Sequence, residues 1–188
     1  RSPARTLMSR SAAHALERVQ EVTDAVAWTA VEQTLGADVL QSWPWGELKA
    51  RHGWTPRRLA VLDGDGRSRA AAQILFRSAG PVSVAYVPRG PAAVPDAQDA
   101  LSALTLAIDE MCRRARSIAA LVEPARDDLA LPSRGSLVWE PTDVLLQPRR
   151  TITVRIDRSD DDLLAAMKPK TRYNVRLATR RGVVVRHG

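Results

Sequence analysis

Two apolar runs on either side of a Gly-Asp-Gly turn constrain the fold of this chain more than any other feature. Residues 56–63, PRRLAVLD, predict a strand, and residues 67–77, RSRAAAQILFR, predict the strand that returns beside it. The glycines at 64 and 66 are typical of a tight turn between two such strands. A third strand is expected at residues 81–87, PVSVAYV, so the chain is expected to build a sheet.

Helical patterns flank these strands. Residues 23–35 predict one helix, and residues 96–117 predict the clearest amphipathic helix, with apolar side chains at helical spacing. A short apolar strand, IAALVEP, follows and ends at Glu123-Pro124. This order of elements predicts an α/β (α+β) fold, in which helices flank a mixed sheet.

The stretch LQSWPWGELKARHGW, residues 40–54, is rich in tryptophan although aromatic residues make up only 4% of the chain. Its three tryptophans are Trp43, Trp45 and Trp54. Ser42 is a good N-cap for a short helix, and Pro44 suits its first turn. The tryptophans can simply fill the core. Alternatively Trp45 and Lys49, one helical turn apart, line a ligand cleft with the amine pointing outwards.

The third predicted strand ends in PRGP, residues 88–91, which places Arg89 between rigid neighbours. One interpretation is an ordinary polar turn. The other is an arginine that the loop holds at the mouth of a binding site.

A second unit is expected after an irregular, proline-containing stretch at residues 125–149. It opens with the alternating strand TITVRID at Thr151, and Ser159 caps a helix that starts with acidic residues. A basic helix and a VVVR strand follow. The chain does not start with Met and stops soon after this strand, which indicates a piece of a longer reading frame. We therefore expect a flexible leader at 1–22, a first unit at 23–148 and the beginning of a second, truncated unit at 149–188.

The segment Lys168–Gly182, KPKTRYNVRLATRRG, concentrates the charge of the chain. Seven basic and no acidic residues lie from Lys168 onward, and they account for the whole formal charge of +7. Pro169 suits the first turn of a helix. Basic residues then recur every fourth position on one face: Lys168, Arg172, Arg176 and Arg180. Tyr173 and Leu177 share another face that can pack on a core. The stripe is either a solvated face or, because like charges repel, a binding surface for phosphate or polyanions.

Several kinds of chemistry find no support in these residues. The one cysteine, Cys112, excludes an intrachain disulfide framework, and the three histidines are far apart in sequence, so neither a metal site nor a cofactor is expected. Walker, GxGxxG, HExxH and GxSxG motifs are absent. No apolar run reaches the roughly 18 residues that span a bilayer, and no signal peptide is evident. We expect a soluble, cytoplasmic protein without a transmembrane segment.

Taken together, the motifs resemble those of the FemABX-type aminoacyl transferases of peptidoglycan synthesis. The matching pieces, over roughly residues 25–186, are LQSWPWGELKARHGW, YVPRGP, LVEP, QPRRTITVRID and KPKTRYNVRLATRRGV. The resemblance implies two acetyltransferase-like (GNAT-like) subdomains, of which this chain would hold the first and the start of the second. It also implies an aminoacyltransferase that carries an amino acid from aminoacyl-tRNA to a peptide amine of a cell-wall precursor.

The resemblance also implies roles for particular residues. Lys49 matches a lysine that the family uses near the precursor diphosphate, and the Trp45 ring would shape the same cleft. Arg89 and Gly90 match an RGP loop. The family's K-x-R-x-N-I-R helix, here with Val175 at the usual isoleucine, is matched by Lys170, Arg172, Tyr173, Asn174 and Arg176. No catalytic residue is identified, because the acceptor's own amine attacks an ester that the tRNA has already activated.

The implied partners are aminoacyl-tRNA and a precursor, either UDP-MurNAc-peptide or lipid II, with peripheral contact to a membrane when the precursor is lipid-linked. A fragment that lacks part of the precursor cleft is expected to be inactive. Two other functions stay open: a nucleic-acid-binding module that uses the basic helix, and a GNAT-like N-acyltransferase with another donor.

Overall fold

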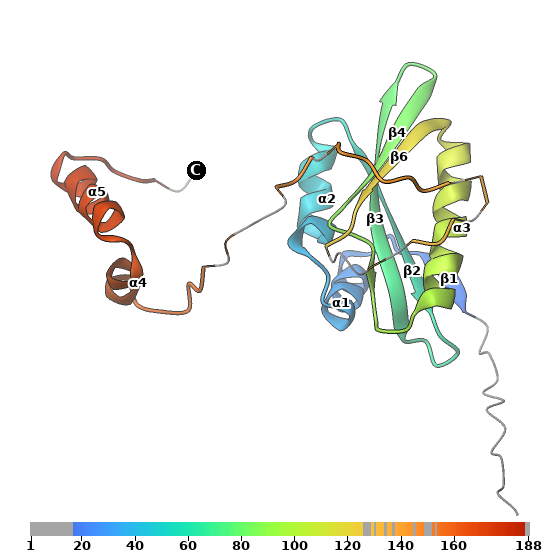
Figure 1. Cartoon of the computed structure of the whole chain (residues 1–188), viewed down its shortest axis with the longest axis horizontal. Coiled ribbons are helices and arrows are strands. Elements are labelled where there is room, and N and C mark those ends of the chain that lie inside the picture. The colour runs from blue at the N-terminus through green and yellow to red at the C-terminus, as the bar shows by residue number, and fades with distance from the viewer. Residues whose placement is uncertain are drawn as a thin grey trace, which may run out of the picture. The chain divides into compact units, whose positions relative to one another are not determined.

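The computed structural model describes residues 17–186 except 126–128, 130, 134, 137, 145, 149–151 and 153. The chain divides into two compact units, Arg1–Gln147 and Pro148–Gly188, and each is described by itself (Figure 1).

A mixed sheet in the order β1-β2-β3-β4-β6 forms the middle of the first unit, and β5 pairs with β3. Its strands are β1 (Arg18–Glu21), β2 (Thr55–Leu62), β3 (Ser68–Ala79), β4 (Val82–Pro88), β5 (Ala92–Ala93) and β6 (Ser117–Glu123). The predicted hairpin is confirmed: β2 and β3 are antiparallel, and Asp63 Oδ1 accepts from the backbone N–H groups of Asp65 and Arg67 in the turn. Because β6 runs parallel to β4, these two strands end at the same edge of the sheet.

The strand β1 corrects one expectation. Residues 18–21 were expected to belong to a leader covering 1–22, but they pair antiparallel with β2, from Arg18 opposite Leu62 to Glu21 opposite Leu59. Glu21 also forms an ion pair with Arg57 of β2. A strand of four residues carries too little alternation to be recognised from sequence. It forms because the edge of β2 would otherwise leave backbone groups unpaired.

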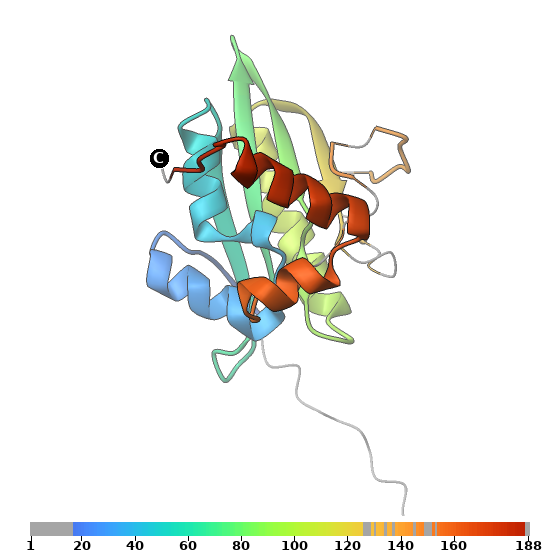
Figure 2. The same ribbon diagram turned by 90° about the vertical axis from the view of Figure 1, so that its left-hand side faces the viewer.

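Helices cover both faces of the sheet (Figures 1 and 2). They are α1 (Ala25–Leu35), the 3-10 helix η1 (Val39–Gln41), α2 (Trp43–Ala50) and α3 (Gln98–Arg114). Successive residues of β2 serve opposite faces, as strand geometry requires. Leu59 and Val61 pack in the core that includes α3, whereas Ala60 and Leu62 pack with Trp28 of α1.

Cys112 lies in the α3 core and is 4% exposed, as expected for a packing residue. Desolvation raises the pKa of its thiol above the ordinary value.

The sheet and the helices on its faces confirm the predicted fold class of this unit, a mixed sheet flanked by helices.

The second unit contains α4 (Asp160–Ala166) and α5 (Pro169–Arg180). Ser159 caps α4 as predicted, and its Oγ accepts from the backbone N–H of Asp162 at 3.2 Å. The prediction of two strands in this unit is wrong for the residues described. Residues 152 and 154–157 are not in a strand, and residues 183–186 are not in one either. A strand needs a paired neighbour for its backbone groups, and the described part of this unit offers none.

Candidate functional site

Helix α2 begins where its sequence predicts and sets the directions of its side chains. The Oγ of Ser42 accepts from the backbone N–H of Trp45 at 3.3 Å, and a proline lies in the first turn. The N–H of Trp43 donates to Glu32 Oε1 of α1 at 2.8 Å, so the start of α2 is fixed to the preceding helix. Burial raises the pKa of Glu32, and the bond from Trp43 partly offsets this effect.

Lys49, in the last turn of α2, lies against two aromatic rings. Its Nζ is 5.7 Å from the centre of the Trp45 ring and 5.1 Å from the centre of the Trp54 ring. Arg77 of β3 approaches Trp54 as well, with its Cζ 5.6 Å from the ring centre. We call Trp45, Lys49, Trp54 and Arg77 the cationic cluster. Aromatic faces attract cations.

The cationic cluster has no acidic counterpart in the described part of the chain. Among the residues that the structure describes, no carboxylate lies within ion-pair distance of Lys49 or Arg77. Some other surface arginines of this unit form ion pairs with carboxylates, as Arg57 does with Glu21. Two neighbouring positive charges without a carboxylate suit an anionic ligand better than a structural role.

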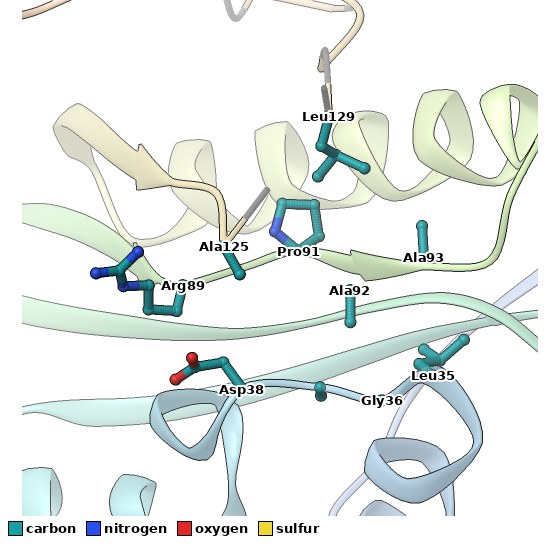
Figure 3. A pocket seen from close by; sticks show the side chains of 10 residues that line it. Leu35, Gly36, Asp38, Arg89, Pro91, Ala92, Ala93, Ala125 and Leu129 are labelled. Atoms are coloured by element: carbon teal, nitrogen blue, oxygen red, sulfur yellow. The ribbon is translucent and has the colours of Figure 1, made fainter. Parts of the chain in front are cut away.

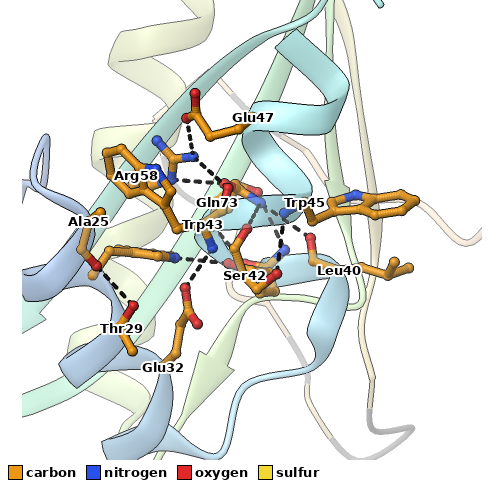
Figure 4. A network of polar contacts seen from close by, with 12 residues as sticks. Ala25, Thr29, Glu32, Leu40, Ser42, Trp43, Trp45, Glu47, Arg58 and Gln73 are labelled. Atoms are coloured by element: carbon orange, nitrogen blue, oxygen red, sulfur yellow. Dashed lines mark hydrogen bonds and ion pairs between the residues drawn. The ribbon is translucent and has the colours of Figure 1, made fainter. Parts of the chain in front are cut away.

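The tryptophans divide between the two interpretations offered by the sequence. Trp43 packs in the core, with the Arg58 guanidinium 3.6 Å from its ring centre. The Trp45 ring points away from Arg58 (Figure 4), and its indole Nε1 is buried without a hydrogen-bond acceptor in the described structure. Trp54 also pairs with Tyr86, with ring centres 6.2 Å apart and planes at 51°.

A buried polar network fixes α2 to the sheet. Arg58 Nε donates to Gln73 Oε1 at 2.8 Å, and its Nη2 donates to Trp43 O at 3.3 Å and to Glu47 Oε1 at 3.2 Å (Figure 4). Burial lowers the pKa of Arg58, and Glu47 opposes that shift. Gly46 lies so close to Gln73 and Arg58 that a Cβ there would overlap both side chains. The network was not predicted, because its residues lie far apart in sequence.

The PRGP loop is built around Gln41. The Gln41 Nε2 donates to Pro88 O at 2.6 Å, and its Oε1 accepts from the Gln73 N–H at 2.7 Å. A Cβ added to Gly90 would lie 2.6 Å from Gln41 Cδ, so this position requires glycine for close approach. Arg89 adopts a φ of 47°, a left-handed conformation that is uncommon for a residue other than glycine.

Arg89 lines a pocket of about 230 Å³ together with other residues of its own loop and β5 and with residues from two other segments, 35–38 and the stretch that holds Ala125 and Leu129. Figure 3 shows Arg89 and Asp38 at the same end of it, and Leu35, Pro91 and Leu129 along its walls. One charge of each sign therefore lies beside an otherwise apolar hollow. Arg89 therefore lines a pocket, and a role in ligand binding stays a prediction.

Tyr86 lies between the cationic cluster and the PRGP loop. Its ring contacts Trp54, and its hydroxyl donates to Glu123 Oε2 at the end of β6. Burial, together with this carboxylate, raises the pKa of Tyr86, and the charge of Arg89 opposes the shift. Sequence reasoning gave no role to Tyr86, Glu123 or Arg77. The first two do fall in the YVPRGP and LVEP motifs, which was the available signal.

The remaining predicted residues, Lys170 to Arg176, lie on α5 in the second unit. Arg172, Tyr173 and Arg176 line a hollow of about 730 Å³ over α4 and α5. Arg172 Nη1 donates to Ala165 O at 3.1 Å, at the end of α4. Tyr173 is 57% exposed, so the face expected to dock on a core is open in the described unit. The structure thus groups Trp45 with Lys49, and Arg89 with Gly90; their convergence with α5 stays a prediction.

Two negative findings apply to the part of the chain that is described. No three His, Cys, Asp or Glu side chains gather there in a way that could hold a metal ion. None of its helices combines the length and the apolar character needed to cross a bilayer.

Known proteins are similar to this chain in sequence and in fold. No family model matches the chain. A lipid II:glycine glycyltransferase of Staphylococcus aureus (strain MRSA252) is 30% identical over 168 residues, which cover 82% of this chain and 40% of that protein. Another, from Staphylococcus aureus, is 31% identical over 161 residues, 79% of this chain and 38% of that protein. The chain thus spans about two fifths of the length of these relatives.

The crystal structure of FemX superposes with a TM-score of 0.61 at 25% identity, covering 86% of this chain and 44% of that one. Sequence and fold agree over most of the chain. They confirm the resemblance that the motifs predicted: the chain is related to the FemABX-type transferases and has the mixed α/β fold of FemX.

Proposed function

We propose that this chain supplies the precursor-binding side of an aminoacyltransferase of peptidoglycan synthesis. The donor would be aminoacyl-tRNA, and the acceptor would be a peptide amine of UDP-MurNAc-peptide or lipid II. The similarity to lipid II:glycine glycyltransferases supports a cell-wall precursor as substrate. The chain covers only part of those relatives, so the activity belongs to the whole protein.

One observation carries this proposal: Lys49 and Arg77 approach the same Trp54 ring, and no described carboxylate neutralises either of them. Both forms of the precursor contain a diphosphate. A lysine ammonium is a compact point charge and suits phosphate oxygens, whereas a guanidinium offers paired donors. The cationic cluster would therefore bind the diphosphate, and the flat rings would support the adjoining part of the precursor.

The PRGP loop would bind another part of the same ligand. Arg89 and Gly90 are held by Gln41, and Tyr86 connects this loop with Trp54. The pocket beside Arg89 is small and mostly apolar, which suits a short side chain or a sugar substituent. The basic helix α5 would add positive charge for precursor or tRNA phosphates through Lys170, Arg172 and Arg176. Tyr173 and Asn174 would add hydrogen-bonding groups beside them.

The reaction needs positioning more than an enzyme nucleophile. The acceptor amine attacks the ester carbonyl of the aminoacyl-tRNA, a C–N bond forms, and the C–O bond to the tRNA breaks. The amine loses a proton, and the tRNA hydroxyl leaves with one. Bringing the two substrates together and stabilising the developing oxyanion can supply most of the acceleration. The residues assigned here would act by binding.

Binding experiments separate this proposal from a nucleic-acid module. The full-length protein should bind a precursor nucleotide or charged tRNA better than an arbitrary oligonucleotide of equal length. A nucleic-acid module would instead bind any oligonucleotide with a steep salt dependence. Equal affinity for all of these ligands would contradict the transferase. Transfer from acyl-CoA to a small amine would favour the GNAT-like N-acyltransferase.

Substitutions in α5 test the second unit. Arg172→Ala and Arg176→Ala in the full-length protein should lower the rate of transfer more than Arg186→Ala, an exposed arginine beyond the helix. Arg176 is the cleaner test, because Arg172 also bonds to α4. Equal rates of transfer for all three variants would show that the basic residues of α5 form a solvated helix face.

A further inference from the structure

Glu123 and Tyr86 hold the last residues of the first unit by side-chain hydrogen bonds. Glu123 Oε1 accepts from the N–H groups of Leu146 at 2.8 Å and Gln147 at 3.2 Å. Gln147 Nε2 also donates to the Tyr86 hydroxyl at 3.2 Å, and that hydroxyl donates to the other oxygen of Glu123. Gln147 is the residue at which the first unit ends, and the second begins at Pro148.

These bonds replace secondary structure at the boundary between the units. The described residues from Pro124 to Pro148 form no helix and no strand, so the segment must be fixed by other contacts. Tyr86 and Glu123 themselves are rigidly placed, because β4 and β6 pair in parallel register, Tyr86 opposite Leu121 and Pro88 opposite Glu123. The end of the segment is thereby attached to the central sheet.

The same tyrosine contacts the cationic cluster. One end of its side chain, the ring, packs against Trp54, whose other neighbours are Lys49 and Arg77. Its other end, the hydroxyl, takes part in the hydrogen bonds to Glu123 and Gln147. The buried side chain of Tyr86 therefore contacts both the proposed diphosphate site and Gln147, the last residue of the first unit.

Both oxygens of Glu123 accept hydrogen bonds, from two backbone N–H groups and from a tyrosine hydroxyl. Its arrangement is that of a structural clamp.

We propose that Tyr86 and Glu123 are positioning residues, which hold Leu146 and Gln147, the last residues of the first unit, in a fixed place relative to the cationic cluster. The consequence for transfer rests on the proposed function, because it assumes that both units contact the substrates. The clamp itself can be measured without any activity.

Amide hydrogen exchange on this chain tests the clamp. Glu123→Ala should raise the exchange rates of the Leu146 and Gln147 amides by about tenfold or more, since their acceptor is lost. Exchange at Ile74 in the centre of β3 should not change, which excludes general unfolding. The matched control is Glu140→Ala, which removes an exposed carboxylate from the same segment. Unchanged exchange at Leu146 and Gln147 would overturn the clamp.

Kinetics of the full-length protein test the positioning role. Tyr86→Phe keeps the ring on Trp54 and removes only the hydroxyl, so it remains informative if Glu123→Ala does not fold. It should lower kcat several-fold and leave the affinity for the precursor nucleotide within about twofold of wild type. Faster exchange with an unchanged kcat would overturn the positioning role. Failure of the wild-type protein to transfer would instead contradict the proposed function, and the exchange result would stand.

Discussion

The Lys49 ammonium lies 5.1 Å from the centre of the Trp54 ring, and the Arg77 guanidinium lies 5.6 Å from the same centre. Lys49 comes from the last turn of a helix and Arg77 from a strand. Their meeting at one ring makes a positive site on this unit. The first two predictions concern this site.

Lys49→Gln in the full-length protein should weaken binding of the diphosphate-bearing precursor. Losing a charged hydrogen-bond donor costs about 1.5 to 3 kcal/mol, or roughly 10- to 100-fold in affinity. Titration calorimetry with UDP-MurNAc-peptide measures the change, and circular dichroism verifies the fold. Arg51→Gln, two residues further on and exposed, is the control. Equal affinity for wild type and Lys49→Gln would remove Lys49 from the site.

Arg77→Ala should weaken the same binding by a smaller factor, about threefold to tenfold, because an exposed charge is screened by salt. The loss should shrink as ionic strength rises. Arg67→Ala, at the other end of β3 beside the exposed Asp65, should have no effect. If Arg77→Ala and Arg67→Ala bind alike at low salt, Arg77 has no part in the site.

Gly90→Ala should lower the free energy of unfolding by about 1 to 3 kcal/mol, because its Cβ would overlap Gln41. The Trp28 Nε1–H donates to Gln41 O at 2.9 Å, so its NMR resonance should shift as Gln41 moves. Gly80→Ala is the control: it strains a turn at φ +62° but has open space around it. A Trp28 resonance that stays in place in Gly90→Ala would contradict this account of the loop.

Asp109 should make stability depend on pH on the acid side. Hydrogen bonds from Ser136, aided by Arg113, hold the pKa of Asp109 below its ordinary value of 3.8. The unfolded chain therefore binds this proton more readily than the folded one. The contribution is fully present above pH 3.8 and is lost as pH falls through the lowered pKa.

Chemical denaturation of Asp109→Asn at several pH values tests this effect. The variant should be less stable at neutral pH and should lose less stability than wild type on acidification. Asp143→Asn, an exposed carboxylate in the same unit, should behave like wild type. Parallel stability curves for wild type and Asp109→Asn would show that Asp109 is not a source of the acid dependence.

Local patterns determined most of the elements of the first unit. The Gly-Asp-Gly turn, the Ser42 cap and the apolar stripe of α3 each depend on neighbours within a few residues. Such signals can be read without knowing the rest of the fold. The same holds for the proximity of Trp45 and Lys49, which are one turn apart on a helix. That they bind a common ligand stays a prediction.

Only the tertiary structure decided which distant residues meet. Arg77 reaches Trp54, Gln41 supports the PRGP loop, and Glu123 holds Gln147, across separations that no local pattern encodes. The strand β1 likewise exists because β2 offers it an edge. The sequence by itself determined the helices, turns and caps of the first unit, since these form from short-range interactions. The pairing of strands placed the binding groups, because it joins residues whose proximity depends on the whole sheet.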